Sequence, residues 1–197
     1  MSLTADIYTV FVLLLALFTL ASTFLAVYSI ANTARLKNIR MSWKRGKLGG
    51  YPVFSTSFLL VSIVLTAVVY GNGLNQYYIV SGCYLWISAC WFTSSYLASL
   101  CFISDYGIVK NINDPSQTVA WHQVTDLVEK QDKNGTSMVF IYQKPNKSPG
   151  FQIPELVRLE LFVPDEKEST FQKILTYKLG NTIENVTGKS IDVKAFE

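Results

Sequence analysis

The residue pair in this chain most suited to acid–base chemistry is His122 with Asp126, four residues later. Histidine titrates near neutrality, and a carboxylate that orients its ring is a common arrangement for general-base catalysis. In an extended strand, however, residues four apart are separated by about 13 Å, so the two side chains would not meet. The neighbouring residues favour a strand, because several are β-branched: Val119, Val124, Thr125 and Val128. We therefore predict no catalytic residue here and no enzymatic activity.

The second candidate for chemistry is a set of three cysteines, Cys83, Cys90 and Cys101. Steps of seven and eleven residues return to nearly the same side of a helix. Yet Cys83 and Cys90 would be roughly 10 Å apart along the helix axis, too far for one ion with bonds of about 2.3 Å. We therefore predict no metal site, but a face of small residues that packs against other helices. Its members are Cys83, Cys90, Ser94, Ala98 and Cys101.

Cofactor motifs are also missing from the sequence. It contains no glycine-rich phosphate loop and no nucleophile elbow. No cofactor is predicted, and whether a lipid or pigment binds stays open.

Hydrophobic stretches dominate the first half of the chain. No charged residue occurs between Ile7 and Ala34, or between Leu48 and Ser104. About 20 apolar residues cross a bilayer, so the pattern predicts three transmembrane helices, at about 7–31, 53–70 and 77–99. These helices form an expected membrane domain, residues 1–99. Because they contain no acidic or basic side chain, a pump or a proton carrier is not expected.

The segment 32–52 between the first two helices is expected to be a basic cytoplasmic loop. It contains six cations and no acid: Arg35, Lys37, Arg40, Lys44, Arg45 and Lys47. The positive-inside rule then places the N-terminus outside and the C-terminal domain in the cytoplasm. We expect these cations to fix the topology and to contact anionic lipid headgroups, and we do not expect a nucleic-acid partner.

The remaining residues have the composition of a water-exposed domain, with 11 Lys or Arg and 13 Asp or Glu from Asp105 onward. Short strands alternate with turns, and the Asn-Gly pair at Asn134 predicts a hairpin. An amphipathic helix follows from Pro164, with an apolar stripe that includes Phe171 and Leu175, and Gly180 is expected to end it. The predicted domain covers residues 100–180, followed by a tail, 181–197.

Trp121 and Val124 are the more informative residues around the histidine, and we assign them, with Phe171 and Leu175, to the domain core or an interface. The step of three between Trp121 and Val124 does not fit strict strand alternation. We therefore predict a bulge or a short turn at His122 and Gln123.

The order of these elements resembles the bacterial pleckstrin-homology-like (PH-like) domains, small α+β domains of antiparallel strands capped by one C-terminal helix. The resemblance covers roughly 80 of the 197 residues, in the segments "ISDYGIVKNI", "VAWHQVTDLVEK", "SMVFIYQ" and "LVRLELFVPDEKESTFQKIL". Such domains often follow transmembrane helices. Related domains bind phosphoinositides through a basic first loop, but here that turn, "SDYG", is acidic, so no inositol-phosphate pocket is expected.

The expected function is that of a non-enzymatic accessory or assembly subunit of a larger complex in a membrane, the bacterial inner membrane by this resemblance. Its cytoplasmic domain would contact other subunits. Two alternatives remain: a regulatory protein that senses the membrane surface by binding anionic lipid, and an enzyme of unrecognised class.

Overall fold

The computed structural model describes residues 3–45, 51–132, 135–144 and 155–183. The chain divides into two compact units. The first, called the helical unit, comprises Met1–Ser104 with Asn111–Pro115, and the second, called the sheet unit, comprises Asp105–Lys110 with Ser116–Glu197. The division differs from the expected boundary between residues 99 and 100, because one strand and one later segment group with the helices.

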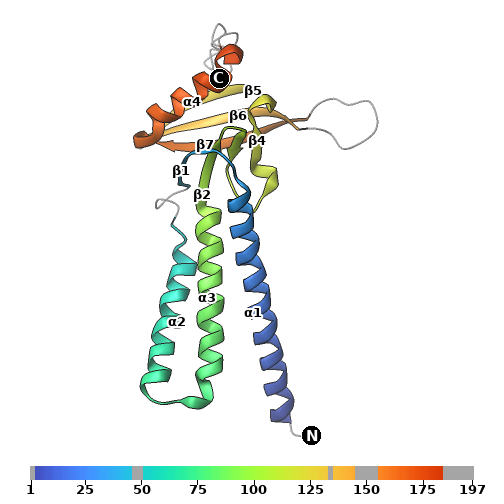
Figure 1. Cartoon of the computed structure of the whole chain (residues 1–197), viewed down its shortest axis with the longest axis vertical. Helices are drawn as coiled ribbons and strands as arrows, with labels where there is room; N and C mark the ends of the chain where they lie inside the picture. The colour runs from blue at the N-terminus through green and yellow to red at the C-terminus, as the bar shows by residue number, and fades with distance from the viewer. Residues whose placement is uncertain (1–2, 46–50, 133–134, 145–154, 184–197) are drawn as a thin grey trace, which may run out of the picture. The chain divides into compact units, whose positions relative to one another are not determined.

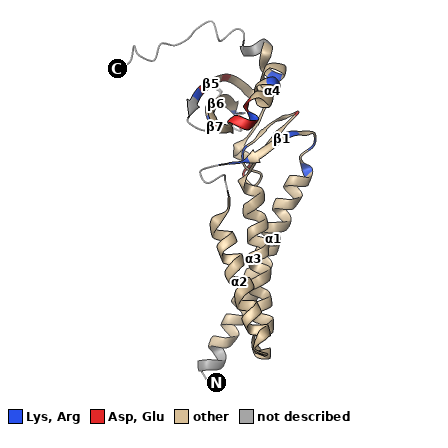
Figure 2. Ribbon diagram, turned by 90° about the vertical axis from the view of Figure 1, so that its left-hand side faces the viewer, with Lys and Arg blue, Asp and Glu red and all other residues tan. Residues whose placement is uncertain are grey.

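Three helices build the helical unit: α1 (Leu3–Arg35), α2 (Val53–Gly71) and α3 (Tyr78–Ser99) (Figure 1). A short 3-10 turn, η2 (Asn75–Tyr77), precedes α3. Among the described helices, two are long and apolar enough to cross a membrane, over Ile7–Arg35 and Val53–Gly71. In Figure 2 the coloured ribbon of these two spans shows no Lys, Arg, Asp or Glu position except at the end of α1.

Helix α3 contacts both α1 and α2. Its buried residues are small, namely Ser81, Ser88, Cys90 and Ser94, and α2 buries Ser55 and Ser62. Small side chains let helix backbones approach closely. Ser81 and Ser88 each donate to the carbonyl three residues earlier, at 3.1 and 2.9 Å. Their hydroxyl groups are therefore satisfied within their own helix.

The basic segment after α1 contains a strand, β1 (Ile39–Lys44), which the sequence analysis treated as loop. It pairs antiparallel with β2 (Leu100–Ser104), which follows α3 directly. Met41 and Trp43 are buried while Ser42 and Lys44 are exposed. The sequence "IRMSWK" contains this alternation of apolar and polar residues with a period of two. The strand was not predicted because the many basic residues of the segment favoured a loop.

Helix α3 ends at Ser99, so Cys101 lies on β2 and not on the helix. The prediction that Cys101 shares a helical face with Cys83 and Cys90 is therefore wrong. Cys101 is fully buried. The backbone N–H of Arg45 donates to Ser99 O at 2.8 Å, and the Arg45 guanidinium donates to Ala98 O at 3.4 Å. Pairing with β1 thus satisfies carbonyl groups that the end of the helix leaves open.

The sheet unit contains two groups of antiparallel strands. In the first, β3 (Gly107–Val109) pairs with β4 (Thr118–Ala120). The second is a three-stranded meander of β5 (Val124–Asp132), β6 (Gly135–Lys144) and β7 (Glu155–Pro164). Two 3-10 turns occur between β3 and β5, η3 (Pro115–Gln117) and η4 (Trp121–Gln123). Asp132 pairs with Gly135 across the predicted hairpin, whose turn lies outside the described residues.

Helix α4 (Asp165–Ile183) packs on the meander. The Phe171 and Phe140 rings meet edge to face, with centroids 6.4 Å apart, and both side chains are fully buried. Leu175 is buried beside them. The helix continues through Gly180, so the predicted end at this residue is wrong. A glycine at the edge of a helix can remain helical, because it lowers helix stability by only about 1 kcal/mol relative to alanine.

We predict that Phe171→Ala destabilises the sheet unit by about 3–5 kcal/mol, because it removes a buried ring and leaves a cavity against Phe140. Tyr177→Ala on the same helix is the control, since the Tyr177 side chain is 82% exposed. Hydrogen exchange of the β6 amides in the detergent-solubilised chain measures the change. Equal exchange in the two variants would show that the aromatic pair does not hold α4 on the sheet.

Candidate functional site

Among the described residues, His122 and Asp126 share no hydrogen bond or ion pair. His122 is exposed on η4, and Asp126 lies on β5, where its Oδ1 accepts the Leu127 N–H at 2.7 Å. In the part of the chain that the structure describes, no hydrogen bond or ion pair involves His122. No group of His, Cys, Asp or Glu side chains among those residues could hold a metal ion.

The predicted bulge or short turn at His122 and Gln123 is confirmed: both residues lie in the 3-10 turn η4. Gln123 Oε1 accepts the Ala120 N–H at 3.1 Å, and the Trp121 N–H donates to Tyr106 O at 3.1 Å. These bonds stabilise the turn between β4 and β5, at the two ends of which Trp121 and Val124 are both buried. The Trp121–Val124 stretch is thus a structural connection between β4 and β5 in the sheet unit.

A buried polar network in the helical unit centres on Ser29 of α1, which is fully buried. Its hydroxyl donates to Leu25 O at 2.9 Å. The Ser94 hydroxyl of α3 lies 2.8 Å away, and Asn113 Nδ2 donates to Ser29 Oγ at 2.9 Å. A serine hydroxyl has one proton and two lone pairs. Because the proton goes to Leu25, Ser94 must be the donor to Ser29, and the hydrogen-bonding capacity of Ser29 is full.

The same network attaches the segment Asn111–Pro115 to the helices. Asn32 Nδ2 donates to Ile112 O at 3.3 Å, and the Asn113 side chain reaches Ser29 from the same segment. Asn113 Oδ1 is buried and has no hydrogen-bond partner among the described residues. This network was not predicted from the sequence, because Ser29 and Asn113 are far apart in the chain and no motif links them.

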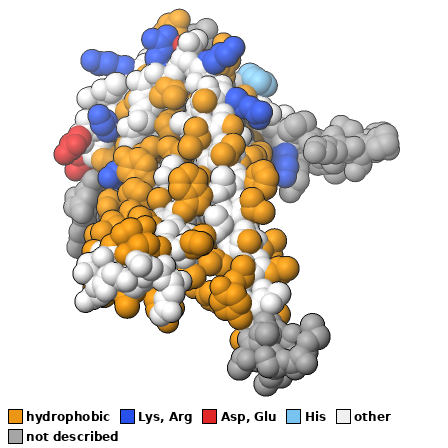
Figure 3. All heavy atoms as spheres, turned by 60° about the horizontal axis from the view of Figure 1, so that its bottom comes forward, with side chains coloured by type: hydrophobic (Ala, Val, Ile, Leu, Met, Phe, Trp, Pro, Cys, Tyr) orange, Lys and Arg blue, Asp and Glu red, His pale blue; other side chains and the backbone are white. Residues whose placement is uncertain are grey.

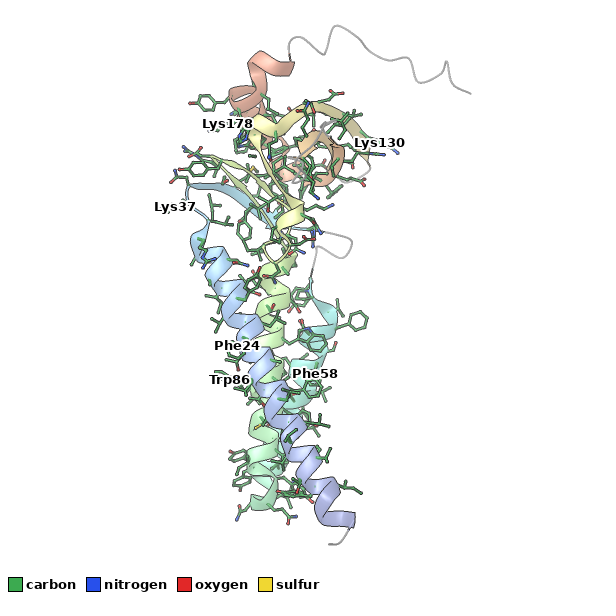
Figure 4. All side chains as sticks on the ribbon, turned by 90° about the vertical axis from the view of Figure 1, so that its right-hand side faces the viewer. Phe24, Lys37, Phe58, Trp86, Lys130 and Lys178 are labelled. Atoms are coloured by element: carbon green, nitrogen blue, oxygen red, sulfur yellow. The ribbon has the colours of Figure 1, made fainter. Side chains whose placement is uncertain are left out.

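An apolar groove of about 520 Å³ lies between the three helices. Its lining residues are Phe11, Leu14, Leu15 and Phe18 from α1, Phe58 from α2, and Tyr84, Ile87 and Trp91 from α3. The Phe58 and Trp91 rings meet edge to face with centroids 5.6 Å apart. Figure 4 labels Phe58 on α2, and Figure 3 shows many hydrophobic side chains, interspersed with polar side chains and backbone, on the visible surface of the helices.

The residues of the predicted packing face on α3 differ in burial. Cys90 and Ser94 are buried, whereas Cys83 and Ala98 are half-buried. Trp86, on a more exposed side of α3, donates from Nε1 to Thr23 Oγ1 at 2.8 Å and so adds a second polar link to α1.

The predicted basic residues fall into three positions. Arg35 is the last residue of α1, and Lys37 follows it in the connection to β1 (Figure 4). Arg40 and Lys44 are exposed on β1, and Arg45 is half-buried at the end of α3. Lys47, which was also predicted to contact lipid headgroups, lies outside the described residues.

We predict that Ser29→Ala destabilises the helical unit by about 1–3 kcal/mol, because it leaves the Ser94 hydroxyl and the Asn113 amide without their acceptor. Ser88→Ala is the matched control, since Ser88 is equally buried but bonds only within its own helix, to Leu85 O. Thermal denaturation in detergent should show the larger loss for Ser29→Ala. Equal losses would mean that the network adds nothing beyond the burial of one hydroxyl group.

The comparisons with known proteins identify no relative: no family model, no curated protein and no solved structure matches the chain. No family is therefore assigned to this chain.

Proposed function

We propose that the protein is a non-enzymatic accessory or assembly subunit of a larger membrane complex, anchored by α1, α2 and α3 as three transmembrane helices. Two of these helices have the length and hydropathy to cross a membrane. The third, α3, has 22 residues without a charged side chain and contacts both others. Its serines lower its hydropathy, but Ser81, Ser88 and Ser94 are buried, so α3 is suited to the centre of a membrane bundle.

The observation that carries the proposal is the apolar groove. Phe11, Leu14, Leu15 and Phe18 follow one face of α1 at steps of three and four, and Tyr84, Ile87 and Trp91 do the same on α3. Two such rows form the walls that an apolar helix fills when it binds in a groove. The occupant that we propose is a transmembrane helix of another subunit.

The chemistry of the groove argues against a polar ligand. Every lining side chain is apolar or aromatic, and the Tyr84 hydroxyl and the Trp91 indole N–H are the only polar side-chain groups among them. An ion or a charged substrate would lose its hydration without gaining partners. The groove therefore favours a partner helix over a transported solute.

For the sheet unit we propose a PH-like domain that contacts other subunits. Among the described residues of this unit, the strands β3 to β7 are followed by α4, and they pair antiparallel where the register is described. Asp105, in the turn between β2 and β3, forms an ion pair with Lys178 of α4 at 3.3 Å. An acidic turn occupied in this way does not favour a phosphoinositide site.

We also propose that the N-terminus faces outward and that the sheet unit lies in the cytoplasm, in a bacterial inner membrane. The support is the positive-inside rule, because the basic segment between α1 and α2 contains six cations, whereas the α2–α3 connection has no charge.

A photoreactive residue in place of Leu14 should form a cross-link to one protein in native membranes, at a segment of that protein long enough to cross the bilayer. Leu13 is the control position, because it has the same side chain and nearly the same depth but lies outside the groove lining. Filling the groove by Ile87→Trp should remove the Leu14 cross-link. Mass spectrometry of the purified adducts identifies the partner.

Lipid adducts alone at both positions, or identical protein adducts at both, would contradict the helix-docking function. The first result would mean that acyl chains fill the groove, and the second that the contact is not specific to it.

The topology predicts opposite labelling of two introduced cysteines, in a chain whose native cysteines are replaced by serine. Asn72→Cys, exposed in the α2–α3 connection, should react with a membrane-impermeant maleimide in intact cells. Lys130→Cys, exposed on β5, should react only after permeabilisation. The reverse pattern would invert the proposed orientation, and labelling of both in intact cells would contradict it.

A further inference from the structure

Lys44 occupies an unusual position at the end of β1. Its ammonium nitrogen lies 5.2 Å from the centroid of the Tyr51 ring and 5.4 Å from that of the Tyr96 ring. Both distances are within the range of cation–π attraction. The flexible lysine side chain is thus held between two aromatic rings.

The backbone around Lys44 is fixed to the end of α3. Lys44 pairs with Leu100, and the next residue, Arg45, donates to the Ser99 and Ala98 carbonyl oxygens of α3. Tyr96 lies in the last turn of the same helix, and Tyr51 lies just before α2. The cation therefore lies at the level where these two helices meet the strands, the level where tyrosine is enriched in membrane proteins.

The N–H donors of the Lys44 ammonium remain available for hydrogen bonds. The aromatic rings attract its charge but accept no ordinary hydrogen bond, and no described carboxylate pairs with Lys44. No acidic residue occurs anywhere between Ile7 and Ser104. The counter-charge of Lys44 must therefore come from outside this stretch of the chain.

We propose that Lys44, Tyr51 and Tyr96 form a binding site for the phosphate headgroup of an anionic phospholipid at the cytoplasmic surface of the membrane. The Lys44 ammonium donates to the phosphate, and the two rings hold the cation and flank the glycerol region of the lipid. The site rests on the membrane placement proposed above, but not on the groove or on its partner helix.

A specific site differs from a general attraction between basic residues and anionic lipid. Lys37 is equally exposed in the same basic segment, but no aromatic ring contacts its ammonium among the described residues. Near a surface, one cation contributes about a five-fold change in anionic lipid binding. A built site requires that Lys44 contribute clearly more than this general factor, whereas Lys37 contributes no more than it.

The test uses the full chain in nanodiscs of phosphatidylcholine with a minority of phosphatidylglycerol. Native mass spectrometry after release counts the phosphatidylglycerol molecules that stay bound. Lys44→Gln should reduce retention by more than about five-fold, whereas Lys37→Gln should reduce it by no more than about five-fold. Tyr96→Leu should weaken retention, because it removes a ring, whereas Tyr96→Phe should preserve it. Excess inorganic phosphate should not displace the lipid if the headgroup is recognised as part of an intact lipid.

Equal losses for Lys44→Gln and Lys37→Gln would overturn the site and leave only general surface attraction. Displacement by inorganic phosphate would overturn the assignment to a lipid. Failure of the chain to enter nanodiscs would instead contradict its membrane placement, and so separates that proposal from this one. Circular dichroism of each variant shows whether a loss reflects unfolding, and the Tyr96→Phe and Tyr96→Leu pair tests the site without a change of charge.

Discussion

The close contact of α3 with α1 and with α2 is the constraint on which the other features of the helical unit depend. Small side chains at Ser81, Ser88 and Ser94 allow this contact, and hydrogen bonds within a helix or to Ser29 make the burial of their hydroxyl groups tolerable. With the small residues inside, the large aromatic side chains lie outside, where they line the groove. The end of α3 also fixes β1 and β2.

The Ser29 network solves a different problem, the attachment of a polar chain segment to apolar helices. One hydroxyl with three partners joins α1, α3 and the segment Asn111–Pro115. The Ser29 hydroxyl can form no further hydrogen bond, so each of its three bonds depends on the other two being in place. A fully used hydroxyl therefore defines one arrangement of the three segments, and alternatives would leave a buried donor without an acceptor.

Much of the fold follows from local sequence patterns, and most of the candidate sites do not. The apolar runs predict α1 and α2, and the Asn-Gly pair predicts the hairpin of β5 and β6, because each signal is local in the sequence. The strand β1 was missed although its alternation is local, since six cations favoured a loop. The Ser29 network and the groove combine residues from distant segments, and only the packing of the helices brings them together.

The pairing of β1 with β2 has a consequence for biosynthesis. Strand β1 emerges from the ribosome after α1, but its partner emerges only after α2 and α3 have been made. Until then the strand has an unsatisfied backbone edge, and its buried residues Met41 and Trp43 have no cover. The last turn of α3 therefore reaches its capped form only when this long-range closure occurs. The strand pair of the helical unit therefore forms only after all three helices have been synthesised.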